Sequence, residues 1–397
     1  IEDKKYFILH APRQMGKTTQ MIALAKELNQ EGKHVALYIN VEAGQAMREK
    51  VEQVNQVILD QIWMRVQQQL PKAYWPSESC YAIQESEQKL QKFLFNWCSS
   101  LEKPLLLFMD EIDALLGDSL LSVLRQLRGS YDQRPQAAPQ SVALIGLRDV
   151  RDYRIHSSSS KEPITGGSAF NIKDKSLVLG NFTEEQVRQL MLQHTDATGQ
   201  RFEEAALDKI FDYTQGQPWL TNALGRELCF EEQAIPWNQT ITAQHVERAK
   251  EVLILRRDVH LDQLADKLTE ARVMGVIQAI LLGENLAGMQ DISAEDRQYV
   301  IDLGLIRRGA LGLEISNPIY QEIIPRELTS MTQDSFEEDP RWYVKANGQL
   351  DMKKVIDQYI EFYKENVEMV STPGFYAEAA HHLLLMAWLQ RIVNGGG

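Results

Sequence analysis

Residues 11–19 read Ala-Pro-Arg-Gln-Met-Gly-Lys-Thr-Thr, and this stretch decides the fold. It follows the short apolar run YFILH at residues 6–10. It precedes QMIALAKEL at residues 20–28, in which apolar side chains recur at helical spacing. The order predicts a buried strand, a glycine-containing turn and an amphipathic helix.

The turn has the spacing of a phosphate-binding loop (P-loop), GxxxxGK[ST], with Ala11 in place of the first glycine. Such a loop wraps phosphates with backbone N–H groups, and the next helix N-terminus adds its dipole. Pro12 favours an extended backbone at Ala11, which alanine can adopt. We expect Lys17 to reach the β- and γ-phosphates and the Thr18 hydroxyl to ligate Mg²⁺. The expected nucleotide contacts in this loop are Ala11, Arg13, Gln14, Met15, Gly16, Lys17, Thr18 and Thr19.

A pair of acids follows a second apolar run. LLLFM at residues 105–109 predicts a buried strand, and Asp110 and Glu111 come directly after it. We expect Asp110 to hold Mg²⁺ through water and Glu111 to polarise the attacking water as a general base. Asp113 is predicted to be a helix N-cap near the site.

The next predicted strand, ALIGL at residues 143–147, ends at Arg148. The carboxyl ends of strands border the ligand crevice in a doubly wound sheet. Arg148 is therefore predicted to sense the γ-phosphate. The expected catalytic residues are Lys17, Glu111 and Arg148.

Two further arginines follow in the same segment. Arg151 and Arg154 either act on the nucleotide of a neighbouring subunit or are surface charges paired with Asp149 and Asp152. The alternation of charges favours the surface interpretation.

Continuously apolar strands alternate with helical stretches over residues 1–182, which predicts an α/β fold with a parallel sheet of the P-loop NTPase type. Residues 183–265 have helical periodicity and are predicted to form a helical lid. Residues 266–330 have the order helix, helix, hairpin, which is typical of a winged helix-turn-helix. Residues 331–397 are predicted to be an acidic linker and a C-terminal helical segment.

Gly216-Gln217-Pro218-Trp219 interrupts the predicted lid. Proline inside a helix lacks the N–H donor and clashes with the preceding turn, so we expect a break between two helices here. The turn either holds the lid near the base of the nucleotide, with Pro218 as a contact, or is an ordinary connection between two helices.

Composition excludes several classes of protein. The chain has 397 residues, a formal charge of −13 and 44% hydrophobic residues, which is typical of a globular protein. Its apolar runs are far shorter than the roughly 20 residues of a membrane span. The 3 cysteines are widely spaced, which argues against a disulfide framework or a cysteine-based zinc site and favours a reducing cytoplasm. The acidic balance argues against general nucleic-acid coating.

The motifs together resemble an AAA-like family of ATPases related to the AAA+ and STAND branches. The resemblance covers about residues 1–328 and rests on the order HAPRQMGKTT, LLLFMDEID, ALIGLRDVRDYR, SAFNI with SLVLGNFTEEQV, TQGQPWLTNAL and HLDQLADKL. It implies an ASCE-type core, a helical lid carrying the GxP turn, and a winged helix. It also implies ATP and Mg²⁺ as ligands, a sensor role for Arg148, nucleotide contact for Pro218, and a homo-oligomer.

The last 23 residues, FYAEAAHHLLLMAWLQRIVNGGG, look like the first helix of a PD-(D/E)XK nuclease module. Glu378 matches the acid on that helix, whereas the Asp and Glu-x-Lys would lie after Gly397. A solvent-facing role for Glu378 is the alternative. The adjacent His381 and His382 face different ways on a helix and are not expected to form a metal pair. From the resemblance we also expect both ends of the native protein to be missing from this sequence.

The leading hypothesis is an Mg-ATP-hydrolysing switch or motor for a C-terminal nuclease-like effector, with anti-phage defence as a family-level analogy. The first alternative is a STAND-like signalling switch that oligomerises with little turnover. The second is a winged-helix regulator that binds DNA. The charge of −13 counts against it, and its expected wing carries only Arg307 and Arg308.

Overall fold

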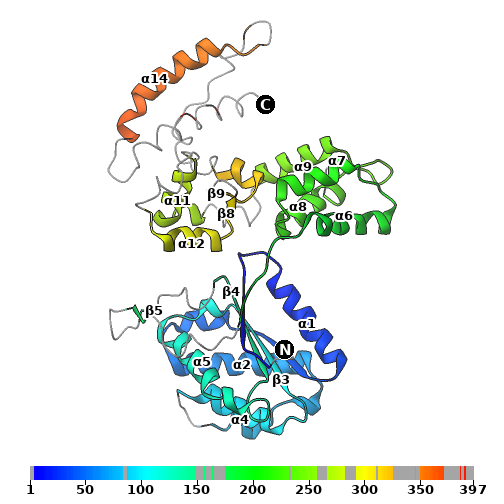
Figure 1. Cartoon of the computed structure of the whole chain (residues 1–397), viewed down its shortest axis with the longest axis vertical. Coiled ribbons are helices and arrows are strands. Elements are labelled where there is room, and N and C mark those ends of the chain that lie inside the picture. Colours follow the sequence, from blue (N-terminus) through cyan, green and yellow to red (C-terminus); the bar gives the residue numbers. More distant parts are fainter. Residues whose placement is uncertain are drawn as a thin grey trace. The chain divides into compact units, whose positions relative to one another are not determined.

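The computed structural model of the chain describes residues 4–83, 87–148, 155–156, 163–164, 175–231, 234–256, 266–281, 292–309, 312–324, 345, 349–370, 385 and 389. The chain divides into two compact units, Ile1–Gly180 and Asn181–Gly397 (Figure 1). Each unit is described by itself below.

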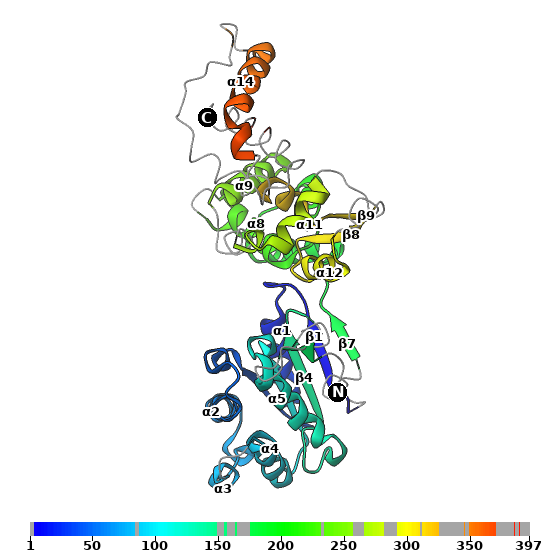
Figure 2. The same ribbon diagram turned by 90° about the vertical axis from the view of Figure 1, so that its left-hand side faces the viewer.

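Unit 1 contains a five-stranded sheet with the order β2-β3-β4-β1-β7. All its strand pairs are parallel, and β1 lies between β4 and β7 (Figure 2). The expected α/β fold with a parallel sheet is therefore confirmed. The strands are β1 (Phe7–His10), β2 (Val35–Asn40), β3 (Leu105–Asp110), β4 (Ser141–Gly146) and β7 (Lys175–Val178).

Helices and short turns connect these strands. The helices of unit 1 are α1 (Lys17–Glu31), α2 (Val51–Gln69), α3 (Glu78–Tyr81), α4 (Lys89–Ser100) and α5 (Gly117–Gly129). The 3₁₀ turns are η1 (Glu42–Met47), η2 (Lys72–Tyr74), η3 (Ile112–Ala114) and η4 (Tyr131–Gln133). A separate short ladder joins β5 (Ile155–His156) to β6 (Pro163–Ile164).

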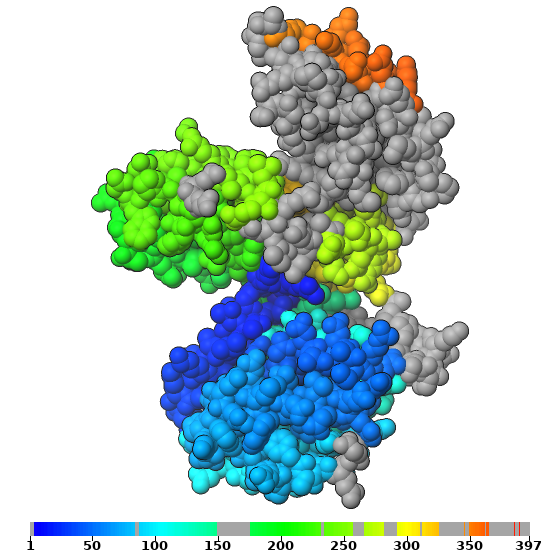
Figure 3. Space-filling view, turned by 180° about the vertical axis from the view of Figure 1, so that it is seen from behind, coloured from blue at the N-terminus to red at the C-terminus, as the bar shows by residue number. Residues whose placement is uncertain are grey.

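Successive side chains of the strands enter two different cores, because a strand presents alternate residues to opposite faces. On one face, Ala36 and Tyr38 of β2 pack with Met21 and Ala25 of α1. On the other face the sheet packs against α2, α4 and α5, with Trp97 fully buried. Residues of α1, α2 and α4, in blue and cyan, cover the visible face of unit 1 in Figure 3. The sheet is covered on both faces, as the apolar strands predict.

The free border of β2 is closed by two side-chain amides. Asn29 of α1 accepts from the Ala36 N–H (2.9 Å) and donates to the Ala36 carbonyl (2.8 Å). Gln69 of α2 makes the same pair of bonds with Tyr38, at 3.1 and 2.9 Å. The two amides thus replace the hydrogen bonds of a further strand. At the opposite border, β7 is exposed along its whole length.

Two expected elements of unit 1 have different bounds in the structure. The helical periodicity of residues 45–70 predicts one helix, whereas the structure has η1 followed by α2, since the chain turns at Arg48, whose φ is 50°. The apolar run SLVLGNF predicts a strand over residues 176–182, whereas β7 ends at Val178. After Leu179, whose N–H donates to the His10 carbonyl (3.1 Å), the chain leaves the sheet.

Unit 2 begins with the expected run of helices. They are α6 (Glu184–Thr198), α7 (Glu204–Thr214), α8 (Pro218–Cys229) and α9 (Ala243–Arg256). Thr183 and Gln186 form a capping box at the start of α6. The four helices share one apolar core that includes Val187 and Leu224.

The order helix, helix, hairpin is present after these helices. The elements are α11 (Ala271–Leu281), α12 (Ala294–Asp302), β8 (Ile306–Gly309) and β9 (Gly312–Ile315), and α14 (Met352–Val370) follows. A second core joins α11, α12, β8 and β9 to Leu220 of α8 and Leu253 of α9. No helix in the described part of the chain has the length and hydropathy needed to cross a membrane.

Candidate nucleotide-binding site

The loop between β1 and α1 carries the backbone geometry of a phosphate cradle. Gly16 is the N-cap of α1 with φ 80° and ψ 13°, and Gln14 has φ 59°. A Cβ added at Gly16 would have no neighbour within 4 Å, so the space in front of the loop is open there. The Gln14 Oε1 atom is buried and has no hydrogen-bond partner among the residues that the structure describes. An open cradle at a helix N-terminus is suited to an anion.

The other loop residues divide into two groups. Ala11 and Met15 are buried, so they can offer the nucleotide main-chain groups only. The Ala11 N–H donates to the Gly146 carbonyl at 3.3 Å, which ties the start of the loop to the end of β4. Arg13 and Thr19 are exposed.

Lys17 is folded back over its own loop. Its Nζ donates to the carbonyls of Ala11 (2.7 Å) and Pro12 (2.8 Å), and only 9% of the residue is exposed. Burial lowers the pKa of Lys17, while the carboxylates of Glu111 and Asp110 oppose that change. A buried cation that is bonded to two neutral carbonyls is suited to exchange these for anionic phosphate oxygens.

Thr18 and Asp110 join the two sequence motifs, which are 92 residues apart. The Thr18 hydroxyl donates to Asp110 Oδ2 at 2.5 Å. The Tyr38 hydroxyl donates to the same oxygen at 2.7 Å, and the Glu111 N–H donates to Asp110 Oδ1 at 2.9 Å. Asp110 is fully buried. A hydroxyl and a carboxylate at hydrogen-bond distance are the oxygen donors that Mg²⁺ prefers.

Glu111 lies directly after β3 in a left-handed backbone conformation, with φ 57° and ψ 41°. This conformation is rare for a residue with a side chain and is found disproportionately at functional sites. Burial raises the pKa of Glu111, and the nearby Asp113 and Asp110 carboxylates raise it further, against the opposing effect of Lys17. A carboxylate with a raised pKa is a better proton acceptor than an ordinary glutamate.

Asp113 has a different role from the one predicted. The prediction of an N-cap is wrong, because the N-cap of α5 is Leu116. Asp113 lies in η3, and its Oδ1 accepts from the Leu147 N–H at 3.2 Å. The carboxylate therefore ties the end of β3 to the end of β4.

Arg148 follows β4 by two residues, and only 8% of it is exposed. In the sheet register His10 is opposite Gly146, so Arg148 lies at the edge where the phosphate loop begins. This placement agrees with a sensor position, and the role itself stays a prediction.

The donor set fits Mg²⁺ and a nucleotide. Gly16 leaves open space at a helix N-terminus, Lys17 supplies a cation, and Thr18 with Asp110 supplies the oxygens for a divalent ion. All these groups lie at the carboxyl end of the parallel strands, where α/β sheets bind ligands.

The family of the chain follows from its sequence match. Residues 5–323 match a protein family described as an AAA-like domain, which is most of the chain. The chain belongs to this AAA-like family. Comparison with curated proteins gives no match.

Several solved structures are similar to this AAA-like protein. The Walker-type ATPase PABY2304 of Pyrococcus abyssi aligns with a TM-score of 0.51 and 15% identity over 81% of this chain and 91% of that chain. The RuvB Holliday junction branch migration motor of Thermotoga maritima aligns with a TM-score of 0.41 and 16% identity over 81% and 87%. ORC1 of Aeropyrum pernix in complex with DNA aligns with a TM-score of 0.41 and 12% identity over 82% and 86%. The first of these supports the P-loop ATPase fold of this AAA-like chain.

The predicted turn before Pro218 is present in unit 2. Helix α7 ends at Thr214, Gln215 and Gly216 have φ of 48° and 69°, and Pro218 is the first residue of α8. The Gln217 side chain accepts from the Leu220 N–H and caps α8. The contact of Pro218 with the nucleotide stays a prediction.

Other predicted residues lie outside the described residues. They are Asp149, Arg151, Asp152, Arg154, Glu378, His381 and His382.

The hairpin residue Arg307, a candidate for contact with DNA, has protein partners. Its guanidinium bonds to Glu314 at 2.7 Å and to the Gln215 Oε1 atom at 2.6 Å. These bonds give Arg307 a structural role in unit 2, which weakens the case for DNA contact by the wing. Arg308 is exposed.

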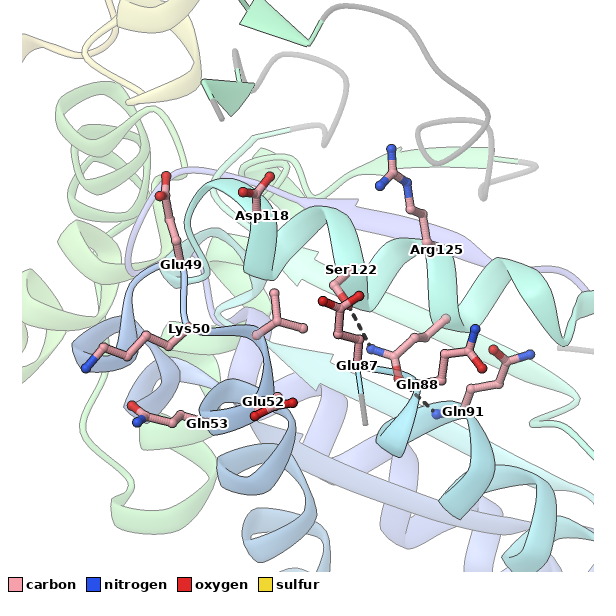
Figure 4. A pocket seen from close by; sticks show the side chains of 12 residues that line it. Glu49, Lys50, Glu52, Gln53, Glu87, Gln88, Gln91, Asp118, Ser122 and Arg125 are labelled. Atoms are coloured by element: carbon pink, nitrogen blue, oxygen red, sulfur yellow. Dashed lines mark hydrogen bonds between the residues drawn. The ribbon is translucent and has the colours of Figure 1, made fainter. Parts of the chain in front are cut away.

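A polar hollow of about 690 Å³ lies near the N-terminal ends of α2, α4 and α5 (Figure 4). Its floor is held together by the Gln126 amide, which donates to Asn55 Oδ1 (3.0 Å) and Ser122 Oγ (3.1 Å) and accepts from the Gln91 N–H (3.1 Å). The residues that line it include none of the phosphate loop. We assign this network to the packing of the three helices.

Sequence reasoning missed Tyr38 as a residue of the site. It stands inside the apolar run HVALYIN, where an aromatic residue looks like core. Only the register reveals its position, because Tyr38 is opposite Phe108 and its hydroxyl reaches Asp110 at the end of the neighbouring strand.

Proposed function

We propose that the chain binds Mg-ATP and hydrolyses it to ADP and phosphate. The 2.5 Å hydrogen bond between Thr18 and Asp110 carries this proposal, because it brings together the two motifs that ATP hydrolysis needs. The fold and the AAA-like family support it. Under the proposal the nucleotide phosphates lie against the loop from Ala11 to Thr19.

Each residue of the site has a chemical task in this proposal. Lys17 would exchange its two carbonyl partners for phosphate oxygens. Thr18 and Asp110 would hold Mg²⁺, which when bound neutralises charge on the phosphates. Glu111 would accept a proton from the attacking water, and its raised pKa suits it to that task. Arg148 would stabilise charge on the γ-phosphate, and Pro218 would contact the nucleotide.

The Glu111→Gln variant tests the proposal. Removal of the general base should lower phosphate release by about 10²-fold or more while ATP binding is retained. Phosphate release and ATP affinity are measured for the wild type and both variants, and Glu27→Gln on the exposed face of α1 is the matched control. Equal phosphate release by the wild type and Glu111→Gln would reject the catalytic assignment. Binding of ATP without turnover by the wild type would favour the STAND-like switch instead.

ATP binding and hydrolysis would control another part of the protein. From the resemblance, we propose that the cycle switches or drives a C-terminal nuclease-like effector in a homo-oligomer, with a winged helix over residues 266–330 as part of the switch. The order α11, α12, β8, β9 supports the winged helix. The nuclease-like module and a role in anti-phage defence rest on the resemblance of the last 23 residues alone.

A further inference from the structure

The carboxylate of Asp110 has its donors arranged around both oxygens. Oδ2 accepts from the hydroxyls of Thr18 (2.5 Å) and Tyr38 (2.7 Å), and Oδ1 accepts from the Glu111 N–H (2.9 Å). An ionised carboxylate offers about four lone-pair sites. Among the described residues, three of these sites therefore have donors, and the one that remains belongs to Oδ1.

Tyr38 is held in place on all sides. Only 2% of the residue is exposed, and its ring packs in the same core as Phe108 and Ala25. Its N–H and carbonyl are both bonded to the Gln69 amide at the border of the sheet. A hydroxyl on such a rigid residue can fix the orientation of its partner.

The direction of the hydrogen bond follows from the chemistry of the two groups. An ionised carboxylate can only accept, so the Tyr38 hydroxyl is the donor to Asp110 Oδ2.

We infer that Tyr38 is a positioning residue for the metal site. It locks the Asp110 carboxylate so that Oδ2 faces Thr18 and the free lone pair of Oδ1 is left for a water of the metal shell. The inference rests on the proposed Mg-ATP site and adds to it a residue from the outermost strand of the sheet. Without Tyr38, Oδ2 would keep the Thr18 hydroxyl as its one donor, and Oδ1 would keep the Glu111 N–H.

The Tyr38→Phe variant tests this inference, because it removes one hydroxyl and keeps the ring in the core. The Mg²⁺ concentration for half-maximal binding of a fluorescent ATP analogue should rise about tenfold or more, the size expected for one hydrogen bond to a charged carboxylate. Binding in EDTA, without Mg²⁺, should change by less than about twofold, because Lys17 and the loop are untouched. A merely structural effect would weaken binding equally in both conditions.

Tyr6→Phe is the matched control. Tyr6 is a buried tyrosine of the same unit, and its hydroxyl donates to the Pro139 carbonyl at 3.1 Å. This variant should leave the Mg²⁺ requirement unchanged. A Tyr38→Phe protein with the wild-type Mg²⁺ requirement would overturn the role of Tyr38 and leave the proposed function intact. A wild type whose nucleotide binding does not depend on Mg²⁺ would overturn both.

Discussion

Individual residues of the phosphate site are held in costly states. Glu111 has a left-handed backbone, and Lys17 is a buried cation whose Nζ donates to two neutral carbonyls. Conformations of this kind cost about 1–3 kcal/mol each and persist where the surroundings impose them. Here Asp110 does so, since its Oδ1 accepts the Glu111 N–H. The site therefore lowers the free energy of unfolding and holds Glu111 and Lys17 in the positions that the proposed reaction needs.

The raised pKa of Glu111 predicts how pH acts on stability. The folded protein holds the Glu111 proton more tightly than the unfolded chain, so this group makes folding less favourable as pH rises through its folded pKa. Glu111→Gln should therefore raise the melting temperature by roughly 1–3 °C near pH 8. The gain should be smaller near pH 5, because the penalty builds up only as the pH rises from the ordinary glutamate pKa of 4.5 through the raised pKa of the folded state. Thermal unfolding at the two pH values measures it, and a gain that is larger at the lower pH would contradict the assignment.

At the scale of elements, the turn between α7 and α8 is packed against the beginning of unit 2. The Phe182 N–H donates to the Gly216 carbonyl at 2.8 Å, and Asn181 Nδ2 donates to the Gln215 carbonyl at 2.9 Å. A Cβ at Gly216 would lie 1.9 Å from the Phe182 carbonyl oxygen. Glycine is thus required at residue 216 by a close approach and by its positive φ.

Two glycine variants separate these two requirements. Gly199 also has a positive φ, of 79°, but a Cβ there would meet no atom within 4 Å. Gly199→Ala should cost about 1–2 kcal/mol for the left-handed backbone alone. Gly216→Ala should cost about 1–3 kcal/mol more because of the clash. Urea unfolding followed by far-UV circular dichroism measures the free energy of unfolding of both variants. Equal losses of this free energy would show that the clash with Phe182 costs nothing.

Sequence reasoning succeeded where a local pattern determines the element. The apolar runs predicted the strands because strands covered on both faces have no polar side, and the proline predicted the start of α8. It failed where the deciding partner is remote in the chain. Asp113 bonds to Leu147, and Tyr38 bonds to Asp110 across 72 residues. Neither partner leaves a local signal.

At the scale of the whole molecule, each unit has cores of its own. Two apolar clusters belong to unit 1 and two to unit 2. Between them, Leu179 is bonded to His10 and Asn181 is bonded to Gln215. Gly180 stands between these two anchored residues, and a Cβ there would meet no atom within 4 Å.

Separate cores predict two thermal transitions in calorimetry, because each unit can unfold with its own cooperativity. Mg-ATP should stabilise unit 1 by mass action, by about 2.7 kcal/mol at a ligand concentration of a hundred times Kd. This stabilisation should raise the temperature of the unit 1 transition. The proposed contact of Pro218 with the nucleotide predicts a smaller rise in the second transition. Lys17→Ala is the control and should lose both rises. A rise confined to one transition would reject the contact of Pro218.

The two borders of the sheet differ in what they allow. Asn29 and Gln69 occupy the outer hydrogen-bonding groups of β2, whereas β7 at the other end is exposed. A sheet grows only by pairing with unoccupied backbone groups. A polypeptide that extended this sheet, whether from the same chain or from another, would therefore be blocked at Ala36 and Tyr38 of β2 and would find exposed residues at β7. Two amide side chains, one on α1 and one on α2, thus disfavour the addition of a strand at the β2 border of the sheet.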